Sequence, residues 1–344
     1  MFIIIIYFII FAVAFLGIKL FLRLNKKWNI LDVPNERSSH TRPTPRGGGL
    51  VIVLVSLLAY TIYTNFFTRE FSWAYFGGAI LIVSISWLDD LYSVSSLLRF
   101  IVHSIAAGLI VLYLGESQSI YIPFYGLLKS NFCPQIIIFL WIVWLTNAYN
   151  FMDGIDALAG MQAVTAGLGW LMVGKILGQE TAGFYGGVIA FSSLGFLIFN
   201  RYPAKIFMGD VGSAFLGYTF AVFPFLFFRE TVIDTAILPV VAILLVWLFV
   251  FDTVLTLTRR LFKREKIWQA HRSHIYQRLV AAGVSQVKVT GLYVLISLTI
   301  IILIFINLRI NNFWSATIII ITIESLGLFI FSRIKERSKT PELN

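Results

Sequence analysis

Long apolar runs, separated by short polar segments, repeat along the whole chain of 344 residues. A helix needs roughly 20 mostly apolar residues to cross the hydrocarbon core of a membrane. About eleven runs meet or approach this length, and they are Phe2–Leu22, Leu50–Phe67, Trp73–Trp87, Phe100–Leu114, Ile136–Tyr149, Leu158–Leu177, Phe184–Phe199, Ala214–Phe228, Ile237–Leu257, Val289–Leu308 and Trp314–Phe331. Several are shorter than roughly 17 residues, so we expect polar flanking residues to complete their last turns. The pattern predicts an all-α, polytopic membrane protein.

Composition supports this interpretation. Hydrophobic residues make up 58% of the chain and charged residues only 13%, which is more apolar surface than a soluble core can absorb. The runs are continuous and do not alternate as barrel strands do, so the spans are expected to be helices. The first run has no basic residue before it and no obvious cleavage site, which favours an uncleaved span over a signal peptide. We treat residues 1–344 as one domain.

The distribution of positive charge predicts the orientation. An odd number of spans puts the two ends of the chain on opposite sides of the membrane. With the N-terminus outside, 22 of the 27 lysines and arginines fall on one side, which the positive-inside rule assigns to the cytoplasm together with the C-terminus. The external segment Gly115–Asn131 then predicts a short interfacial hairpin. The net charge of +10 indicates cytoplasmic loops that face anionic lipid or an anionic substrate, and in a membrane protein this explanation is better than binding of nucleic acid.

A row of polar residues follows the apolar run that ends at Leu145. The row consists of Asn147, Asn150, Asp153 and Asp156, at a strict three-residue interval. On a helix this interval keeps neighbouring side chains close, and Gly154 would loosen the helix or let a ligand approach. Carboxylates and amides at the end of a membrane span are costly without a partner. The row predicts one wall of a metal and phosphate site; an ordinary polar helix end is the alternative.

Three further carboxylates lie at the expected cytoplasmic ends of other spans. Asp89 and Asp90 close the third span, and adjacent residues on a helix point about 100° apart, so one would bind a metal while the other orients it. Asp210 lies between two glycines before the eighth span and would supply another carboxylate to the same cation. Oxygen-only ligands suit Mg²⁺ or Mn²⁺. Solvated helix ends are the alternative.

Two glycine-containing segments begin helices, where backbone amides would face an anion. One follows Arg46 as Gly47-Gly48-Gly49, and the other surrounds Asp210. The first segment is also explained as a positively charged topology loop with a glycine-tolerant helix start.

The last large cytoplasmic loop is rich in hydrogen-bond donors. It carries His271, Arg272, His274 and Arg278, which together suit phosphate; a plain surface helix is the alternative, and no third ligand completes a zinc site. Asp252 lies one to two turns inside the ninth span, so we expect it to have a partner, either an arginine further along or a group on another helix. Structural and functional roles are both open for Asp252.

Carboxylates with a divalent cation beside arginine and histidine donors are typical of phosphoryl transfer. Two other classes are possible. A secondary transporter would carry acids near the midplane and an internal repeat, neither of which is evident. A membrane prenyltransferase would carry two aspartate-rich motifs of wider spacing, but Ser93 stands where a further acid would be needed.

The motifs, taken in order, resemble those of the polyprenyl-phosphate N-acetylhexosamine-1-phosphate transferases, glycosyl transferase family four. The matching segments are Thr44–Gly49, Asp89-Asp90, Asn147–Ala159, Gly209–Ser213, Asp252-Thr253 with Arg259-Arg260, and His274–Leu279. The resemblance implies ten or eleven spans and Mg²⁺-dependent transfer of a sugar-1-phosphate from a UDP-N-acetylhexosamine to undecaprenyl phosphate, with release of UMP. It also implies a bacterial inner membrane with the site facing the cytoplasm.

The resemblance also implies roles for residues. Asp89, Asp90 and Asp210 would serve catalysis, with Asp90 and Asp210 on the metal. Arg46, the Asn147–Asp156 row and the histidine loop would bind substrates. Three positions depart from the usual pattern, namely Ala157 in place of glycine and Tyr276 and Gln277 in place of histidines. This form of the loop resembles the O-antigen-initiating branch, which uses sugars of the N-acetylfucosamine, N-acetylquinovosamine or N-acetylglucosamine type.

Overall fold

The computed structural model describes residues 2–34, 42–115, 119–122, 126–129, 132–226, 237–265, 272–310 and 314–339. Nearly all of this part of the chain is helical, as the sequence predicts. The helices are α1 (Phe2–Trp28), α2 (Gly49–Tyr63) with a π-helical extension η1 (Thr64–Thr68), α3 (Trp73–Tyr92), α4 (Ser96–Leu114), α5 (Cys133–Phe151), α6 (Leu158–Ile176), α7 (Glu180–Asn200), α8 (Asp210–Leu226), α9 (Leu238–Leu245), α10 (Trp247–Phe262), α11 (Ile275–Ala281), α12 (Gln286–Ile310) and α13 (Trp314–Lys339).

Each of the eleven expected spans coincides with a helix or a helix pair. Among the described residues, seven helices are long and apolar enough to cross a membrane, or eight when the bent pair α9–α10 counts as one span. The chain is therefore a multi-pass membrane protein. Helix α8 is apolar but only 17 residues long, and its N-terminal turn carries Asp210. The candidate residue Asp210 therefore lies at the polar end of a short apolar helix.

The expected single span Ile237–Leu257 is wrong in one respect, because it breaks at Val246. Helices α9 and α10 meet there at 77°. A break inside an apolar run leaves backbone carbonyls without helical partners, which is costly in lipid. Gln162 of α6 meets this need: its Nε2 donates to the carbonyl of Leu245 at 2.8 Å. Hydropathy shows only that both halves are apolar, so it did not reveal the bend.

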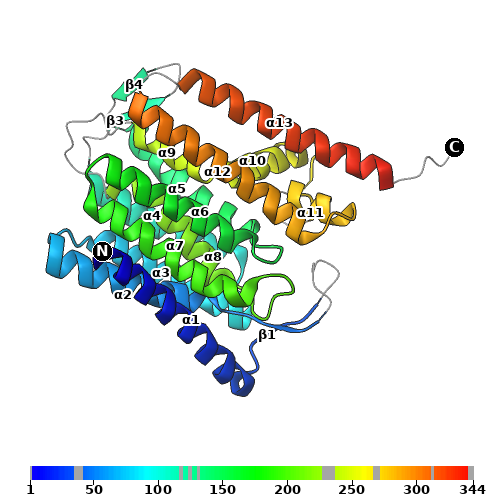
Figure 1. The fold of residues 1–344 in the computed structure, drawn as a ribbon, viewed down its shortest axis with the longest axis horizontal. Helices are drawn as coiled ribbons and strands as arrows, with labels where there is room; N and C mark the ends of the chain where they lie inside the picture. Colours follow the sequence, from blue (N-terminus) through cyan, green and yellow to red (C-terminus); the bar gives the residue numbers. More distant parts are fainter. Residues whose placement is uncertain are drawn as a thin grey trace.

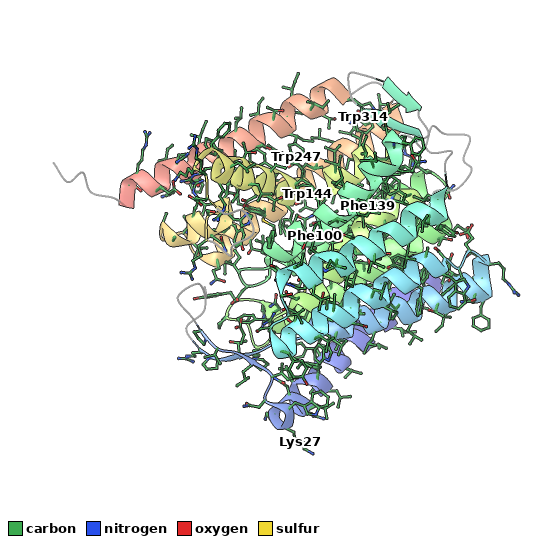
Figure 2. The ribbon with its side chains drawn as sticks, turned by 180° about the vertical axis from the view of Figure 1, so that it is seen from behind. Lys27, Phe100, Phe139, Trp144, Trp247 and Trp314 are labelled. Carbon is green, nitrogen blue, oxygen red and sulfur yellow. The ribbon has the colours of Figure 1, made fainter. Side chains whose placement is uncertain are left out.

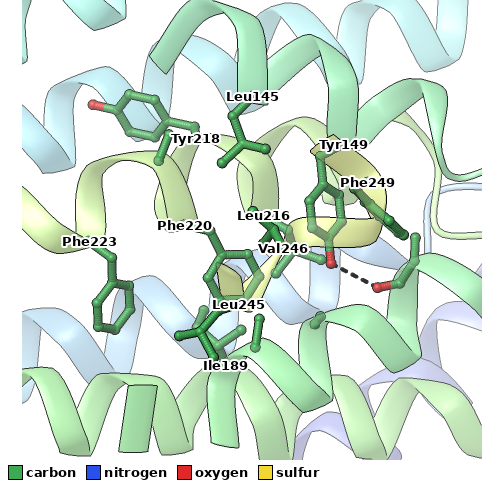
Figure 3. Close-up of a cluster of buried hydrophobic side chains, with 14 of the residues drawn as sticks. Leu145, Tyr149, Ile189, Leu216, Tyr218, Phe220, Phe223, Leu245, Val246 and Phe249 are labelled. Carbon is green, nitrogen blue, oxygen red and sulfur yellow. Dashed lines mark hydrogen bonds between the residues drawn. The ribbon is translucent and has the colours of Figure 1, made fainter. Parts of the chain in front are cut away.

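The centre of the bundle is built by α5 to α9. Helices α6 and α7 approach closely through glycines: a Cβ on Gly174 would lie 2.3 Å from the backbone nitrogen of Gly183. Small residues let membrane helices approach this closely and gain van der Waals contact. Around them aromatic and aliphatic side chains such as Phe220 and Phe223 fill the interior (Figure 3). There the Tyr149 hydroxyl donates to the carbonyl of Ala159 at 2.9 Å, which ties α5 to α6.

The first and last helices flank the bundle. Lys27 near the end of α1 and Trp314 at the start of α13 lie at opposite edges (Figure 2). The two-stranded sheet of β1 (Leu31–Asp32) and β2 (Thr44–Pro45) lies at the same end of the bundle as α11, and a hairpin of β3 (Ser119–Ile122) and β4 (Gly126–Lys129) lies at the other end (Figure 1). The predicted hairpin is confirmed. The polar motifs gather at the α11 end.

Candidate active site

Four segments bring charged side chains together at the α11 end, and a fifth adds an amide. Asp89 and Asp90 close α3, and Asp210 opens α8. Arg46 comes from the turn before α2, and Arg99 lies one turn into α4. Asn150, in the last turn of α5, completes the group. We call these residues the acidic site.

Asp90 binds the N-terminus of α8. Its Oδ1 accepts the backbone N–H of Asp210 at 2.9 Å, and its Oδ2 accepts that of Val211 at 3.1 Å. The first N–H groups of a helix lack partners and favour an anion, so Asp90 takes the place predicted for a ligand. Gly209 permits this approach: its φ is +78°, and a Cβ there would lie 2.5 Å from Oδ2 of Asp90. Arg46 balances the charge, with Nη2 2.5 Å from Oδ1 of Asp90.

Asp210 is the residue shared by the most partners in the acidic site. Arg46 Nη2 lies 2.9 Å from its Oδ1, and Arg99 Nη1 lies 2.8 Å from its Oδ2. Asn150 Nδ2 also donates to Oδ2, at 3.0 Å. The Asn150 amide is oriented in turn by Ser213, whose hydroxyl donates to Oδ1 of Asn150 at 2.6 Å. One carboxylate thus joins the turn before α2 with α4, α5 and α8.

Asp89 faces the other arginine. Its Oδ2 lies 2.6 Å from Arg99 Nη1, and its Oδ1 accepts the backbone N–H of Val94 at 2.6 Å. Sequence reasoning counted Arg99 only as a topology charge and missed its place in the site. A signal was present, because Arg99 opens the helix that directly follows the Asp89-Asp90 turn, and the two helices pack together.

The positive and negative charges of the acidic site nearly cancel. Three carboxylates share two guanidinium groups, and the side chains of Arg46, Arg99 and Asp210 keep 26%, 27% and 19% of their exposure. Burial alone would lower the pKa of the Arg46 guanidinium, but Asp90 and Asp210 raise it above its ordinary value. Arg46 therefore remains charged, and both arginine side chains still reach solvent.

The expected helical row is only half right, because α5 ends at Phe151. Asn147 and Asn150 lie on the helix, whereas Asp153 and Asp156 lie in the loop 152–157. Burial, with Asp210 and Asp90 close by, raises the pKa of Asp153 from its ordinary value of 3.8 to about 7. Asp156 holds the loop in place: its Oδ2 accepts the backbone N–H of Ala204 at 2.9 Å. The three-residue spacing did not show where the helix stops.

Two of the three glycines after Arg46, namely Gly48 and Gly49, do not offer their amides to an anion. The N–H groups of Gly48 and Gly49 donate to the carbonyls of Phe207 and Met208 at 2.9 and 2.8 Å. Gly49 also crosses α8 so closely that a Cβ there would lie 2.3 Å from the Cα of Gly212. This expectation was wrong: the glycines join two loops and place Arg46 beside Asp210.

The four residues of the predicted donor-rich loop do not share one environment. His271 lies outside the described residues, and Arg272 is exposed. His274 Nδ1 lies 3.0 Å from Oδ1 of Asp252, and Arg278 Nη2 donates to Oε2 of Glu336 at 2.6 Å. Asp252 therefore finds its partner on another element, the second of the two options that the sequence left open. The side chains of His274 and Arg278 are engaged within the protein.

The chemistry of the acidic site suits a hard cation. Within the described ranges no three Asp, Glu, His or Cys side chains already converge on one point as metal ligands do. Instead one nitrogen of Arg46 touches Asp90 and Asp210, and one nitrogen of Arg99 touches Asp89 and Asp210. Each arginine occupies the position between two carboxylates that a cation would take. Carboxylate oxygens are the ligands that Mg²⁺ prefers, so the residues fit this ion.

Comparison with known proteins defines the family. Residues 72–228 match glycosyl transferase family 4. The chain is 32% identical over 270 residues to a probable undecaprenyl-phosphate N-acetylglucosaminyl 1-phosphate transferase of Bacillus subtilis, with 76% of this chain and 73% of the relative covered. It is 30% identical over 243 residues to a phospho-N-acetylmuramoyl-pentapeptide-transferase of Listeria monocytogenes, with 64% and 75% covered. The protein belongs to glycosyl transferase family 4, as the motifs predicted.

Proposed function

We propose that the protein transfers an N-acetylhexosamine-1-phosphate from a UDP-sugar to undecaprenyl phosphate and releases UMP. The acceptor phosphate forms a bond to the β-phosphorus of the donor, and the bond between this phosphorus and the oxygen of UMP breaks. The name of the Bacillus subtilis relative indicates transfer of a sugar-1-phosphate to undecaprenyl phosphate, and the name of the Listeria relative indicates transfer of a phosphorylated amino sugar carrying a pentapeptide. The product is the first lipid-linked intermediate of a cell-surface polysaccharide.

One observation carries the proposal, namely that Asp210 meets two arginines and an asparagine at the α11 end of the bundle. This set of groups suits a diphosphate. Arginine binds phosphate oxygens through paired N–H groups, and Arg46 and Arg99 retain enough exposure to exchange a carboxylate for a phosphate. Asn150, oriented by Ser213, supplies a neutral donor beside them.

Mg²⁺ is the proposed cofactor, with Mn²⁺ as a substitute, and Asp90 and Asp210 would hold it while Asp89 orients Arg99. When bound, the ion would neutralise charge on the diphosphate and on the departing UMP. A phosphate monoester has a second pKa near 6, so the acceptor is largely dianionic at pH 7. No residue then needs to remove a proton, and we assign Asp89 and Asp90 to metal binding and positioning.

The donor sugar is proposed as the N-acetylglucosamine, N-acetylfucosamine or N-acetylquinovosamine type, and the pathway as O-antigen synthesis at the inner membrane with the site facing the cytoplasm. A transporter is the alternative function. Ion-coupling acids are expected near the midplane, whereas Asp89, Asp90 and Asp210 lie at helix ends.

The test is to incubate membranes that contain the protein with undecaprenyl phosphate and each labelled UDP-sugar. Lipid-linked sugar and UMP should form in equal amounts, and chelation of Mg²⁺ should stop the reaction. Arg99→Gln should lower the rate about 10²-fold by removing a phosphate-binding charge. Arg309→Gln, at the opposite end of α12 from the site, is the matched control and should leave the rate unchanged. Absence of product with all three donors would overturn the proposal.

A further inference from the structure

The carboxylate of Asp252 holds the start of α11. Asp252 lies on α10 and is fully buried. Its Oδ1 accepts the backbone N–H of Ile275 at 2.8 Å, and its Oδ2 accepts that of Tyr276 at 3.3 Å. These N–H groups lie in the first turn of a helix, where they have no partner within the helix itself. The carboxylate therefore caps α11 from a different element.

Three side chains complete the contacts of Asp252. Tyr293 of α12 donates its hydroxyl to Oδ2 at 2.9 Å, and Thr256 donates to Oδ1 at 3.1 Å. His274 Nδ1 lies 3.0 Å from Oδ1, and it donates, since an ionised carboxylate can only accept. One buried charge thus joins α10, α11 and α12. Such a group is expensive to bury unless these donors are all in place.

Tyr276 continues the connection toward the acidic site. Its hydroxyl donates to the carbonyl of Phe151, the last residue of α5, at 3.0 Å. It also packs on the next loop, where a Cβ on Gly154 would lie 2.1 Å from the Tyr276 hydroxyl. Phe151 directly follows Asn150, whose Nδ2 donates to Oδ2 of Asp210 in the acidic site at 3.0 Å. The position of α11 is therefore linked to the wall of the acidic site.

The other end of α11 is anchored independently. Arg278 pairs through two nitrogens with the carboxylate of Glu336 on α13, and Nη2 lies 2.6 Å from Oε2. Two charged contacts thus hold one short helix of seven residues, one at each end. Isolated helices of this length do not form in water, so the contacts decide where the helix and the segment 272–274 before it lie.

We propose that Asp252 is a positioning residue: it fixes α11 against the loop 152–157 through Tyr276 and so places the segment that begins at Arg272 for contact with an anionic substrate. The identity of that substrate, a nucleoside diphosphate sugar, rests on the proposed function. The anchoring itself rests only on the contacts above. Asp252 touches no reacting atom in this assignment, and it acts through α11.

The test compares Asp252→Asn with the wild-type protein in lipid nanodiscs. Asparagine has nearly the same size as aspartate, but one of its two polar groups is an N–H₂ donor. This group would face donors of the protein that bond to a carboxylate oxygen in the wild type, so those hydrogen bonds are lost. Amide hydrogen exchange across 275–281 should rise about tenfold, the effect of one lost hydrogen bond to a charged group. The KM for the UDP-sugar should rise by a similar factor, while kcat and the Mg²⁺ concentration for half-maximal rate change much less.

Two further variants make the test specific. Thr253→Val changes the neighbouring buried side chain, whose hydroxyl bonds to carbonyls of its own helix, Phe249 and Val250, and it should leave both readouts unchanged. Tyr276→Phe removes the link to Phe151 while Asp252 still caps α11, so KM should rise with little added exchange.

Unchanged exchange in Asp252→Asn would overturn the anchoring, and a fall in kcat at constant KM would overturn the positioning role. If the wild-type protein transfers no sugar, the proposed function fails while the exchange result still decides whether Asp252 anchors α11. The two failures are therefore distinguishable.

Discussion

Asp210 and Asp252 are both aspartates on apolar helices, and both belong to the same end of the bundle, but their surroundings differ. Asp210 is partly exposed and faces two arginine side chains and an amide. Asp252 is fully buried, and backbone N–H groups, two hydroxyls and an imidazole surround it. Side chains on a surface can exchange one partner for another, whereas backbone groups in a buried helix start cannot.

The difference separates two uses of an aspartate in a membrane protein. In the proposed function, the Asp210 carboxylate would release its arginines to a phosphate and accept a metal ion in return. Asp252 is committed to one arrangement, because losing any donor would leave a buried charge unsatisfied. The hydrogen-bond partners of an aspartate on an apolar helix therefore indicate whether its role is functional or structural. Its presence in a sequence motif does not distinguish the two roles.

The largest effect is expected from Asp210→Asn. It removes the charge shared by Arg46 and Arg99, so kcat for sugar-1-phosphate transfer should fall about 10²- to 10³-fold. The comparison with Asp252→Asn is direct, because that variant should act on KM. Steady-state rates measured over a range of donor concentrations give both kcat and KM. Equal losses of kcat in the two variants would remove the distinction between the two aspartates.

A pH-dependent change is expected from Asp153→Asn. The folded protein raises the pKa of Asp153 from 3.8 to about 7, so this carboxyl is more easily protonated in the folded than in the unfolded state. Its contribution to stability is full below pH 4 and is lost as pH rises through 7. Without Mg²⁺, Asp153→Asn should raise the melting temperature at pH 8 and leave it nearly unchanged at pH 3.5. A gain of the same size at both values would contradict the assigned pKa.

A steric change is expected where α11 meets the loop behind the acidic site. Gly154→Ala places a Cβ against the Tyr276 hydroxyl and should cost about 1–3 kcal/mol of unfolding free energy. In a Tyr276→Phe background the cost should shrink but not vanish, because other ring atoms lie 3.0–3.1 Å from the new Cβ. Gly108→Ala, with no atom within 4 Å, is the control. Denaturant titration of the wild-type protein, the two glycine variants, Tyr276→Phe and the double variant measures these differences.

The smallest effect is expected from Ala157→Gly. Ala157 has a φ of +66° before α6, a left-handed conformation that alanine adopts at a cost. Glycine should relieve this strain and raise the free energy of unfolding by about 0.5–1 kcal/mol, provided that Asn200 Oδ1 still accepts the N–H of residue 157. Thermal unfolding measures the gain. A loss of stability would show that the alanine methyl group contributes packing that outweighs the strain.

Local patterns in the sequence predicted much of the fold. Each apolar run that hydropathy identified coincides with a helix or with the bent pair α9–α10 in the described part of the chain. The length of an apolar run sets whether a helix can cross a membrane. Hydropathy did not show the 77° bend at Val246, because both halves are apolar and Gln162 accommodates the break from a different helix. Likewise, the spacing of Asn147, Asn150, Asp153 and Asp156 continues past the point where the helix ends at Phe151.

The sequence alone determined that the chain is an all-α membrane protein of a recognisable transferase family, and it identified Asp89, Asp90, Asp210 and Arg46 as candidates. Only the tertiary structure decided how they pair, since Arg99 and Asp210 are 111 residues apart and meet through helix packing. It also assigned Asp252, His274 and Arg278 to contacts within the protein. Motifs record which groups are present, whereas the free energy of burying a charge depends on the donors that the fold brings to it.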